Sequence, residues 1–248
     1  MQHRTHIQKV VINITAPIAP GASATFPINI SSNFKRVIGV CVNVAILGVY
    51  TPSTILSMLC TLGDSFGNVI FKNLPSNLLE TSWDTPMLGR FLPCNFIVNN
   101  KNQEFTLTNI QSSPIPVGEF HLVFLLSNDE PKHSQIYYQT EKIVTPFSPP
   151  VGSQYSFRFE LAGNYKYCNG LAVSGFDTFR ISLRDDDGYY LPEQYDTMYR
   201  AYVSLPLEER YFPLHVRANR NLIEITAEPI MGTAAPQIAY LTFRLYNE

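Results

Sequence analysis

Residues 185–188, with the sequence Asp-Asp-Asp-Gly, are the densest group of potential metal ligands in this chain. Clustered carboxylates on a turn suit a hard cation such as calcium. Residues 64–67 begin with Asp and end with Gly as well, but carry only one carboxylate. An aspartate and a glycine at these positions also fit a hairpin turn that needs a positive φ. We therefore expect a turn, keep Asp185, Asp186 and Asp187 as the calcium candidate, and expect no other metal and no cofactor.

The other reactive side chains form no catalytic pattern. None of the five histidines belongs to an HExxH motif, no serine sits in a G-x-S-x-G elbow, and no glycine-rich phosphate loop follows a strand. His121 and His215 fall on predicted strands, opposite the core-facing positions, and we expect both to be exposed. Carboxylate pairs for glycoside hydrolysis can be distant in the chain, so the sequence leaves them open. We expect that the protein is not an enzyme.

Cysteine usage and charge narrow the class of protein. Four scattered cysteines show no metal-ligand spacing, which favours free thiols in a reducing compartment. A net charge of −2 gives no electrostatic case for binding nucleic acid, and we expect neither a signal peptide nor a transmembrane segment. Charged residues are only 15% of the chain, against about 25% in typical soluble domains. Partners are therefore expected to cover part of the surface.

The chain repeats itself in a colinear series of identical residues. At a spacing of 131, Gly21 matches Gly152 and Asn33 matches Asn164; the spacing becomes 121, then 120, and 119 at the end. The later pairs are Leu62 with Leu183 and Gly67 with Gly188 at 121, Arg90 with Arg210 and Pro93 with Pro213 at 120, and Phe124 with Phe243 and Asn128 with Asn247 at 119. Self-similarity of this kind indicates two tandem copies of one domain. We place the first copy at 1–128, a polar linker at 129–135 and the second copy at 136–248.

Period-two alternation predicts that both copies are all-β. Apolar residues occupy alternate positions of 24–30 and of 155–161, and the closing segments 122–126 and 241–245 match. About eight strands per copy, with turn signals between them and no helical repeat, are typical of a jelly-roll sandwich. A proline after a leucine opens residues 75–81 and residues 192–200, which predicts a short helix between the sixth and seventh strands of each copy.

Charge and aromatic residues divide unevenly between the copies. Residues 1–128 carry seven basic and five acidic side chains, whereas residues 129–248 carry eleven and fifteen, together with thirteen of the fourteen tyrosines. Apolar exposed patches usually mark contacts, so the first copy is expected to pack against neighbours. An insertion at 47–55 is present in the first copy alone, and its Val49, Tyr50 and Ile55 are candidate contact residues.

With two fused copies, about eight strands in each and a short helix at the same place in both, the chain resembles the double jelly-roll coat proteins of tailless, often membrane-containing bacteriophages and of their eukaryotic virus relatives. The resemblance is architectural and covers nearly the whole chain. It implies a homotrimer whose six sandwiches make a pseudo-hexagonal capsomer of a larger shell. It also implies contacts with other virion proteins, assembly in the host cytoplasm and a place in the virion.

The sequence therefore predicts a structural virion protein, most simply a double jelly-roll capsid protein. Another virion component, such as a spike, vertex or tail-ring protein, fits the small size of the chain. An alternative of another class is a tandem carbohydrate-binding or adhesin module, in which the many tyrosines of the second copy would stack on sugars.

Overall fold

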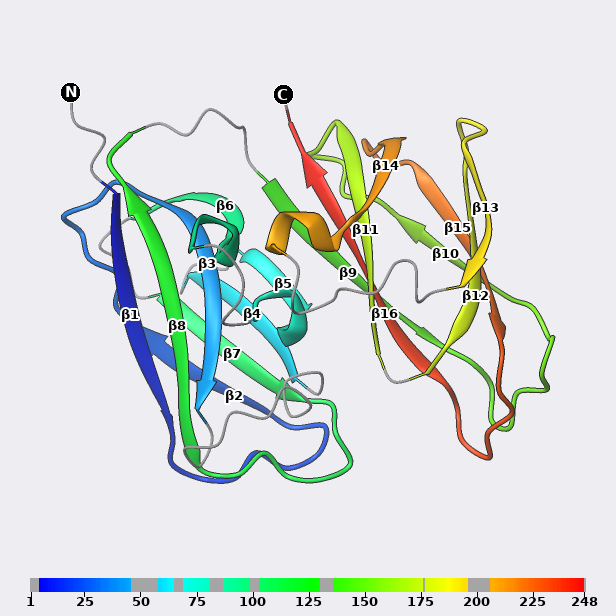
Figure 1. The fold of residues 1–248 in the computed structure, drawn as a ribbon, viewed down its shortest axis with the longest axis horizontal. Coiled ribbons are helices and arrows are strands. Elements are labelled where there is room, and N and C mark those ends of the chain that lie inside the picture. The colour runs from blue at the N-terminus through cyan, green and yellow to red at the C-terminus, as the bar shows by residue number, and fades with distance from the viewer. Residues whose placement is uncertain are drawn as a thin grey trace. The chain divides into compact units, whose positions relative to one another are not determined.

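The computed structural model describes residues 5–45, 58–64, 69–80, 87–98, 103–129, 136–175, 177–195 and 206–247. Its contacts divide the chain into two compact units (Figure 1). Unit 1 comprises Met1–Tyr137 and Tyr202–Glu209, and unit 2 comprises Tyr138–Ala201 and Arg210–Glu248. Both are built from β-strands, as the sequence predicts.

Unit 1 contains eight strands in two antiparallel sheets. They are β1 (Thr5–Ile14), β2 (Ser23–Ile28), β3 (Arg36–Ala45), β4 (Met58–Asp64), β5 (Val69–Pro75), β6 (Leu92–Ile97), β7 (Gln103–Asn109) and β8 (Gly118–Ser127). One sheet has the order β1-β8-β3-β6 and the other runs β5-β4-β7-β2. The chain crosses between the layers as it proceeds, and this order is the jelly roll.

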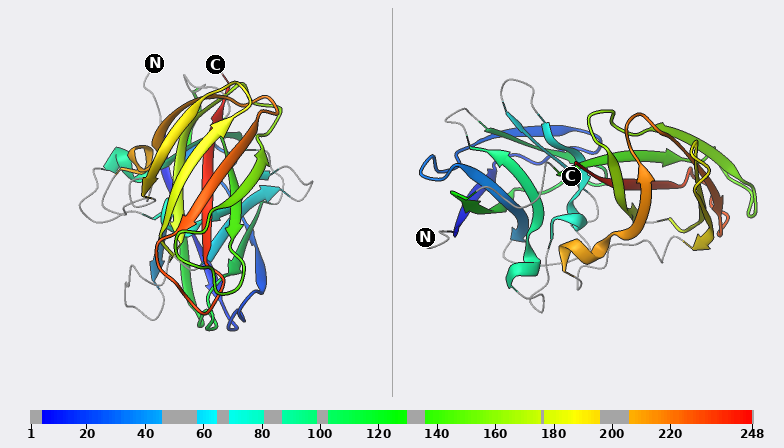
Figure 2. Two further views of the ribbon diagram at one scale, coloured as in Figure 1. Left: turned by 90° about the vertical axis from the view of Figure 1, so that its right-hand side faces the viewer. Right: turned by 90° about the horizontal axis from the view of Figure 1, so that it is seen from above.

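Unit 2 repeats that order strand for strand. Its strands are β9 (Ile136–Val144), β10 (Tyr155–Glu160), β11 (Tyr167–Gly175), β12 (Phe179–Asp185), β13 (Tyr190–Tyr195), β14 (Phe212–Arg217), β15 (Leu222–Pro229) and β16 (Ile238–Tyr246). Its sheets run β9-β16-β11-β14 and β10-β15-β12-β13. In each unit the sheets form two layers (Figure 2). The expectation that both copies share one topology is confirmed.

Each core is made by the inward-facing residues of the two layers. On the closing strand β8, Leu122, Phe124 and Leu126 are fully buried, and so are their counterparts on β16. Met58, Cys60 and Leu62 of β4 are buried, as are the matching Phe179, Ile181 and Leu183 of β12. The alternation predicted for these strands is confirmed, and burial of these side chains is the main source of stability.

An asparagine clasps the same turn in each unit. After β8, the Asn128 side chain accepts a hydrogen bond from the Lys35 backbone N–H (3.0 Å) and donates one to the Asn33 carbonyl (3.5 Å). After β16, Asn247 does the same with Lys166 (2.9 Å) and Asn164 (3.0 Å). These are residues of the repeat series. The matched asparagines therefore have the same structural role in both units: each closes the turn before the third strand, β3 or β11.

A glutamine on the first strand of each unit makes a second matched clasp. Gln8 donates to the Asn29 carbonyl (2.9 Å) and accepts from the Ser31 backbone N–H (2.8 Å). Gln139 makes the equivalent pair of bonds with Glu160 and Ala162, each at 2.9 Å. Both glutamines tie the loop after the second strand to the first strand.

The first short helix lies at the residues that the sequence predicts, and the second does not. The 3-10 helix Ser76–Leu78 falls within the predicted residues 75–81, with Pro75 as its N-cap. This helix and two others in the described part of the chain, Met87–Arg90 and Leu207–Arg210, fall between the fifth and sixth strands of their copies, not between the sixth and seventh. Pro192 begins no helix, because it belongs to β13, the edge strand of its sheet. An edge position tolerates a residue without an N–H, and the register shifts where this proline lies. Residues 196–200 of the predicted helix are outside the described part of the chain.

Among the described residues, no helix is long and apolar enough to cross a membrane.

Two glycines provide a test of the matched packing. A β-carbon at Gly39 would lie 2.7 Å from the Phe91 β-carbon, and one at Gly170 would lie 2.8 Å from that of Tyr211. Both glycines lie where the strand register shifts. We expect Gly39→Ala and Gly170→Ala each to lower the free energy of unfolding by about 1–3 kcal/mol, because overpacking forces the backbone to move.

Chemical denaturation followed by circular dichroism measures this loss. Gly232→Ala is the control, since its nearest non-local atom would be at 3.5 Å from the new β-carbon. Wild-type stability in both test variants would contradict the close approach.

Candidate functional site

The Asp185–Gly188 segment is a closed hairpin turn between β12 and β13. The Asp185 carboxylate accepts a hydrogen bond from the Tyr189 backbone N–H (2.6 Å) and a second from the Asn221 side-chain amide (3.3 Å). Gly188 has a φ of +88°, as expected for its place in the turn. Asp185 is buried and already occupied by these donors. Its shared position in the repeat is thus explained by turn formation.

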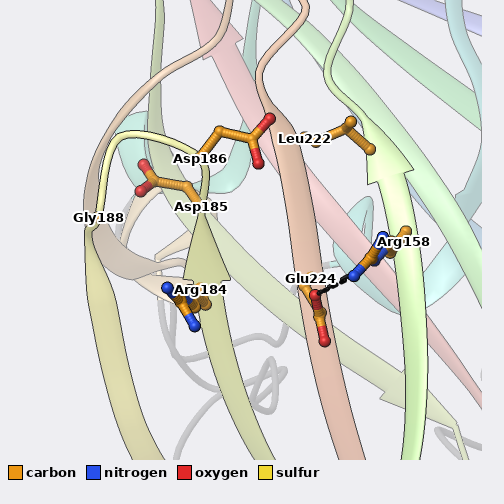
Figure 3. Close-up of a pocket in the computed structure, with 7 residues that line it drawn as sticks. All are labelled: Arg158, Arg184, Asp185, Asp186, Gly188, Leu222 and Glu224. Carbon is orange, nitrogen blue, oxygen red and sulfur yellow. Dashed lines mark hydrogen bonds and ion pairs between the residues drawn. The ribbon is translucent and has the colours of Figure 1, made fainter.

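The remaining two aspartates do not complete a metal site with Asp185. In Figure 3 the carboxylates of Asp185 and Asp186 point away from each other. Within the described ranges, no three His, Cys, Asp or Glu side chains are grouped so that they could hold a metal ion. Calcium needs six to eight converging oxygen ligands, and this turn does not gather them.

A hollow of about 340 Å³ beside this turn is lined mainly by charged side chains. They are Arg158, Arg184, Asp185, Asp186 and Glu224, with Gly188 and Leu222 (Figure 3). Arg158 donates from Nε and Nη2 to one oxygen of Glu224, at 3.2 and 3.0 Å. A glycosidase acid needs a carboxyl group kept protonated by apolar surroundings. The Glu224 carboxylate is instead paired with a guanidinium and stands among other charged side chains, so it lacks these apolar surroundings.

The outer face of the second sheet differs between the units in its chemistry. In unit 2 it carries cross-strand ion pairs: Arg158 with Glu224 (3.0 Å), and Arg180 with Glu228 (3.3 Å) and Glu193 (3.4 Å). The matching face of unit 1 carries hydroxyl pairs, Ser23 with Thr108 and Thr25 with Thr106, each at 2.8 Å. Part of the uneven charge of the two copies therefore lies on equivalent faces of the same fold, although unit 1 also exposes Glu104 there.

The outer face of the first sheet of unit 1 carries a group of aliphatic side chains. Ile7 lies opposite Leu125 on the neighbouring strand, and Lys9 lies opposite Val123. Ile7 and Val11 are 40% and 42% exposed, while Val123 and Leu125 are half-buried. We name this surface, made of Ile7, Lys9, Val11, Val123 and Leu125, the β1–β8 face. The sequence signal for this face is the unbroken apolar run at 122–126. Only every second residue of a strand can point into the core, so the other apolar residues of the run must lie on the outer face.

The contact residues predicted from the sequence, Val49, Tyr50 and Ile55, lie outside the described residues, and so does Gly67. His121 and His215 lie opposite the core-facing set, as predicted. His215 is exposed, whereas the His121 side chain is only 12% exposed and lies 2.9 Å from the Glu119 carboxylate.

The tyrosines within the described ranges do not form one exposed platform. Tyr138, Tyr211 and Tyr240 are buried and cannot stack on a sugar. Tyr167 and Tyr246 form a ring pair with centroids 5.5 Å apart, an arrangement that stabilises neighbouring strands.

All four cysteines are free and buried. Burial raises the pKa of the Cys41 and Cys168 thiols to about 12, and raises the pKa of Cys60 and Cys94 as well. A thiol in such surroundings stays protonated and is a poor nucleophile. These side chains therefore serve as small core hydrophobes.

No protein-family model and no curated protein matches this chain. Solved structures similar to it include the major capsid protein P2 of bacteriophage PM2, with 8% identity, a TM-score of 0.48 and coverage of 97% of this chain and 98% of that one. PBCV-1 VP54 has 9% identity, a TM-score of 0.48 and coverage of 99% and 95%. The STIV MCP has 10% identity, a TM-score of 0.47 and coverage of 97% of both chains. At these identities and TM-scores the similarity carries no conclusion about partners or activity; the strand order itself establishes the jelly-roll fold.

The turn interpretation predicts how the three aspartates respond to substitution. Asp185→Ala should lower the free energy of unfolding by about 1–3 kcal/mol, because two donors lose their acceptor at a buried position. Asp186→Ala and Asp187→Ala should change it by no more than about 0.5 kcal/mol, as is usual for surface positions. Thermal unfolding with calcium and with a chelator supplies the measurement. A calcium-dependent rise in Tm that Asp186→Ala and Asp187→Ala abolish would establish a metal site instead.

The burial of the thiols predicts their reactivity. At pH 8 the native chain should react with a thiol reagent far more slowly than the unfolded chain, whose cysteines have pKa values of about 8.5. A coloured disulfide reagent, added with and without denaturant, measures this ratio. Rapid reaction of the native protein would show that at least one thiol is accessible.

Proposed function

We propose that this chain is a structural protein of a virus particle, a double jelly-roll capsid protein that assembles as a homotrimer. The observation that carries the proposal is the presence of two jelly rolls of identical strand order in one chain. Three such chains around one axis supply six equivalent sandwiches, which is what a pseudo-hexagonal capsomer requires. This is also the arrangement implied by the resemblance to double jelly-roll coat proteins.

We infer that the chain arose by tandem duplication, with copies at 1–128 and 136–248 joined by residues 129–135. The support is the reuse of matched residues in the same contacts. The Asn128 and Asn247 clasps, the Gln8 and Gln139 clasps, and the glycine approaches at Gly39 and Gly170 recur at the spacings of the repeat. The jelly-roll strand order does not require these particular side-chain contacts, so their recurrence favours duplication over an independent origin of the two copies.

A structural role also accords with the chemistry of the described residues. Around the hollow of unit 2, Glu224 is engaged by an arginine and Asp185 by a backbone N–H, and the thiols are buried. The outer faces of unit 1, which carry fewer charges than those of unit 2, suit contacts with neighbours, because burying an unpaired charge costs on the order of several kcal/mol. We propose that the insertion with Val49, Tyr50 and Ile55 adds to these contacts, that other virion proteins also bind the shell, and that assembly takes place in the host cytoplasm.

The oligomeric state tests this function. We expect light scattering after size exclusion to give about three times the chain mass of 28.0 kDa, or a larger shell, with hexagonal outlines in negative stain. Oligomers of this type bury a few thousand Å² per subunit, roughly, and persist on dilution. A chain that stays monomeric at every concentration would overturn the capsid proposal and favour a tandem carbohydrate-binding module, which a glycan array then examines.

A further inference from the structure

Two loops at one end of unit 2 expose large apolar side chains. The loop between β9 and β10 and the loop between β15 and β16 lie side by side at the lower end of this unit in Figure 1. We name residues 145–154 and 230–237 the unit 2 tip. Phe147, Val151 and Met231 of this tip are 74%, 63% and 68% exposed. Single exposed hydrophobic residues are common, but a group of them usually marks a contact.

The two loops of the tip are joined to each other. The Thr145 backbone N–H donates to the Gln237 carbonyl (3.0 Å), and the Gln237 N–H donates to the Thr145 hydroxyl oxygen (2.8 Å). A β-carbon at Gly232 would lie 3.5 Å from the Val151 side chain, so the turn after Met231 packs beside Val151. The three exposed side chains therefore belong to one surface.

The tip also turns polar groups inward onto its own backbone. The Thr233 hydroxyl donates to the Ala235 carbonyl (2.6 Å), and the Gln237 side-chain amide donates to the Met231 carbonyl. Four residues of the tip, at positions 146, 149, 150 and 236, are prolines and have no backbone N–H to satisfy. Both features lower the cost of moving these loops out of water, because each unpaired polar group is expensive to bury.

Charge is excluded from this end of the more highly charged copy. Residues 129–248 carry eleven basic and fifteen acidic side chains, yet none of them falls within 143–157 or 229–243. Asp177 is the acidic residue that contacts the second stretch, and its carboxylate accepts a hydrogen bond from the Ile238 backbone N–H (2.7 Å). The surface around the three apolar side chains is therefore neutral.

The matched end of unit 1 shows that the fold does not require large side chains here. At the spacing of 131, Ala16 matches Phe147 and Pro20 matches Val151. The large residues of the unit 1 loops, Ile18 and Ile115, pair through their backbones and are buried. Val117, at 43%, is the large hydrophobic residue that those loops expose. Phe147 and Val151 are thus additions to a common frame, and they contribute little to the core.

We propose that the unit 2 tip binds the surface of a lipid bilayer, with Phe147, Val151 and Met231 at the boundary between headgroups and acyl chains. A protein contact carries a polar rim and about one hydrogen bond per 100–200 Å². The exposed polar side chains of the tip, by contrast, are only those of Ser148 and Gln154. A neutral apolar projection at the end of a domain, with its backbone partly satisfied from within, suits a bilayer better. This inference goes beyond the proposed function and does not rest on it.

Flotation with phosphatidylcholine vesicles tests the contact. The wild-type chain should float with the vesicles equally well at low and at high salt, because the contact has no ionic component. The double variant Phe147→Asp, Met231→Asp should lower the partition coefficient by at least about tenfold, since it replaces apolar side chains with carboxylates. The control is Tyr190→Asp, Leu222→Asp. These residues are 59% and 42% exposed and stand beside the Asp185–Gly188 turn of the same unit.

Loss of flotation in the tip variant alone, with an unchanged circular dichroism spectrum, supports the inference. It is overturned if the wild-type chain does not float, if the tip variant floats equally well, or if the control loses as much. Flotation that needs anionic lipid and disappears at high salt would also overturn it. A tip variant that has a lower oligomer mass in the absence of lipid would show a protein contact instead. None of these results decides the capsid function, which depends on the mass of the wild-type oligomer without lipid.

A dye on the tip gives a reading that keeps the three apolar side chains in place. Ala234 is exposed in the tip and Asp187 is exposed on the β12–β13 turn. The four native thiols are buried, so a thiol-reactive dye labels the cysteine of Ala234→Cys or Asp187→Cys. Vesicles should shift the emission of an environment-sensitive dye to shorter wavelength at position 234 and leave it unchanged at position 187. An equal response at both positions, or none at position 234, would overturn the assignment.

Discussion

The pairing of the closing strands, β8 and β16, is the constraint on which the rest of each unit depends. β8 is hydrogen-bonded to β1 on one side and to β3 on the other, so it joins the first and third strands of the copy into one sheet. Because side chains alternate along a strand, this pairing commits Leu122, Phe124 and Leu126 to the core. It equally commits Val123 and Leu125 to the outer face. The contacts that we propose for this chain depend on whether other protein covers that outer face.

Around this sheet, a few polar side chains hold the loops in register. Asn128 and Asn247 each offer a donor and an acceptor to the turn that precedes the next strand of the sheet. A backbone N–H or carbonyl that is not paired within a sheet needs such a partner. The turn is exposed, so each bond contributes modestly to stability, by about 0.5–1.5 kcal/mol. Their value lies in specifying one conformation for a loop that connects the two layers.

The two units have kept a common interior and diverged at the surface. Core positions remain apolar in both, and the clasps are retained residue by residue. The outer face of the second sheet, in contrast, carries Ser–Thr and Thr–Thr hydroxyl pairs in one unit and Arg–Glu pairs in the other. Exposed ion pairs contribute about 0.2–1 kcal/mol each, so stability does not explain the exchange. The exchange accords with the contacts proposed for unit 1, since solvent tolerates charge better than a protein contact does.

The sequence by itself determined the all-β class, the repeat and the inward-facing positions of the main strands. It could do so because alternation is a local pattern and the repeat appears when the sequence is compared with itself. Neither requires knowledge of which strands pair. Only the tertiary structure decided three other points. Pro192 became part of an edge strand because β12 supplied a partner, which overrode its helix-start signal. Asp185 became an acceptor within its turn because Asn221, distant in the chain, reaches its carboxylate. Tyr138 and Thr242 are buried while Ile7 is open, although matched positions of a repeat look alike in sequence, because coverage of a sheet depends on whatever the fold brings against it.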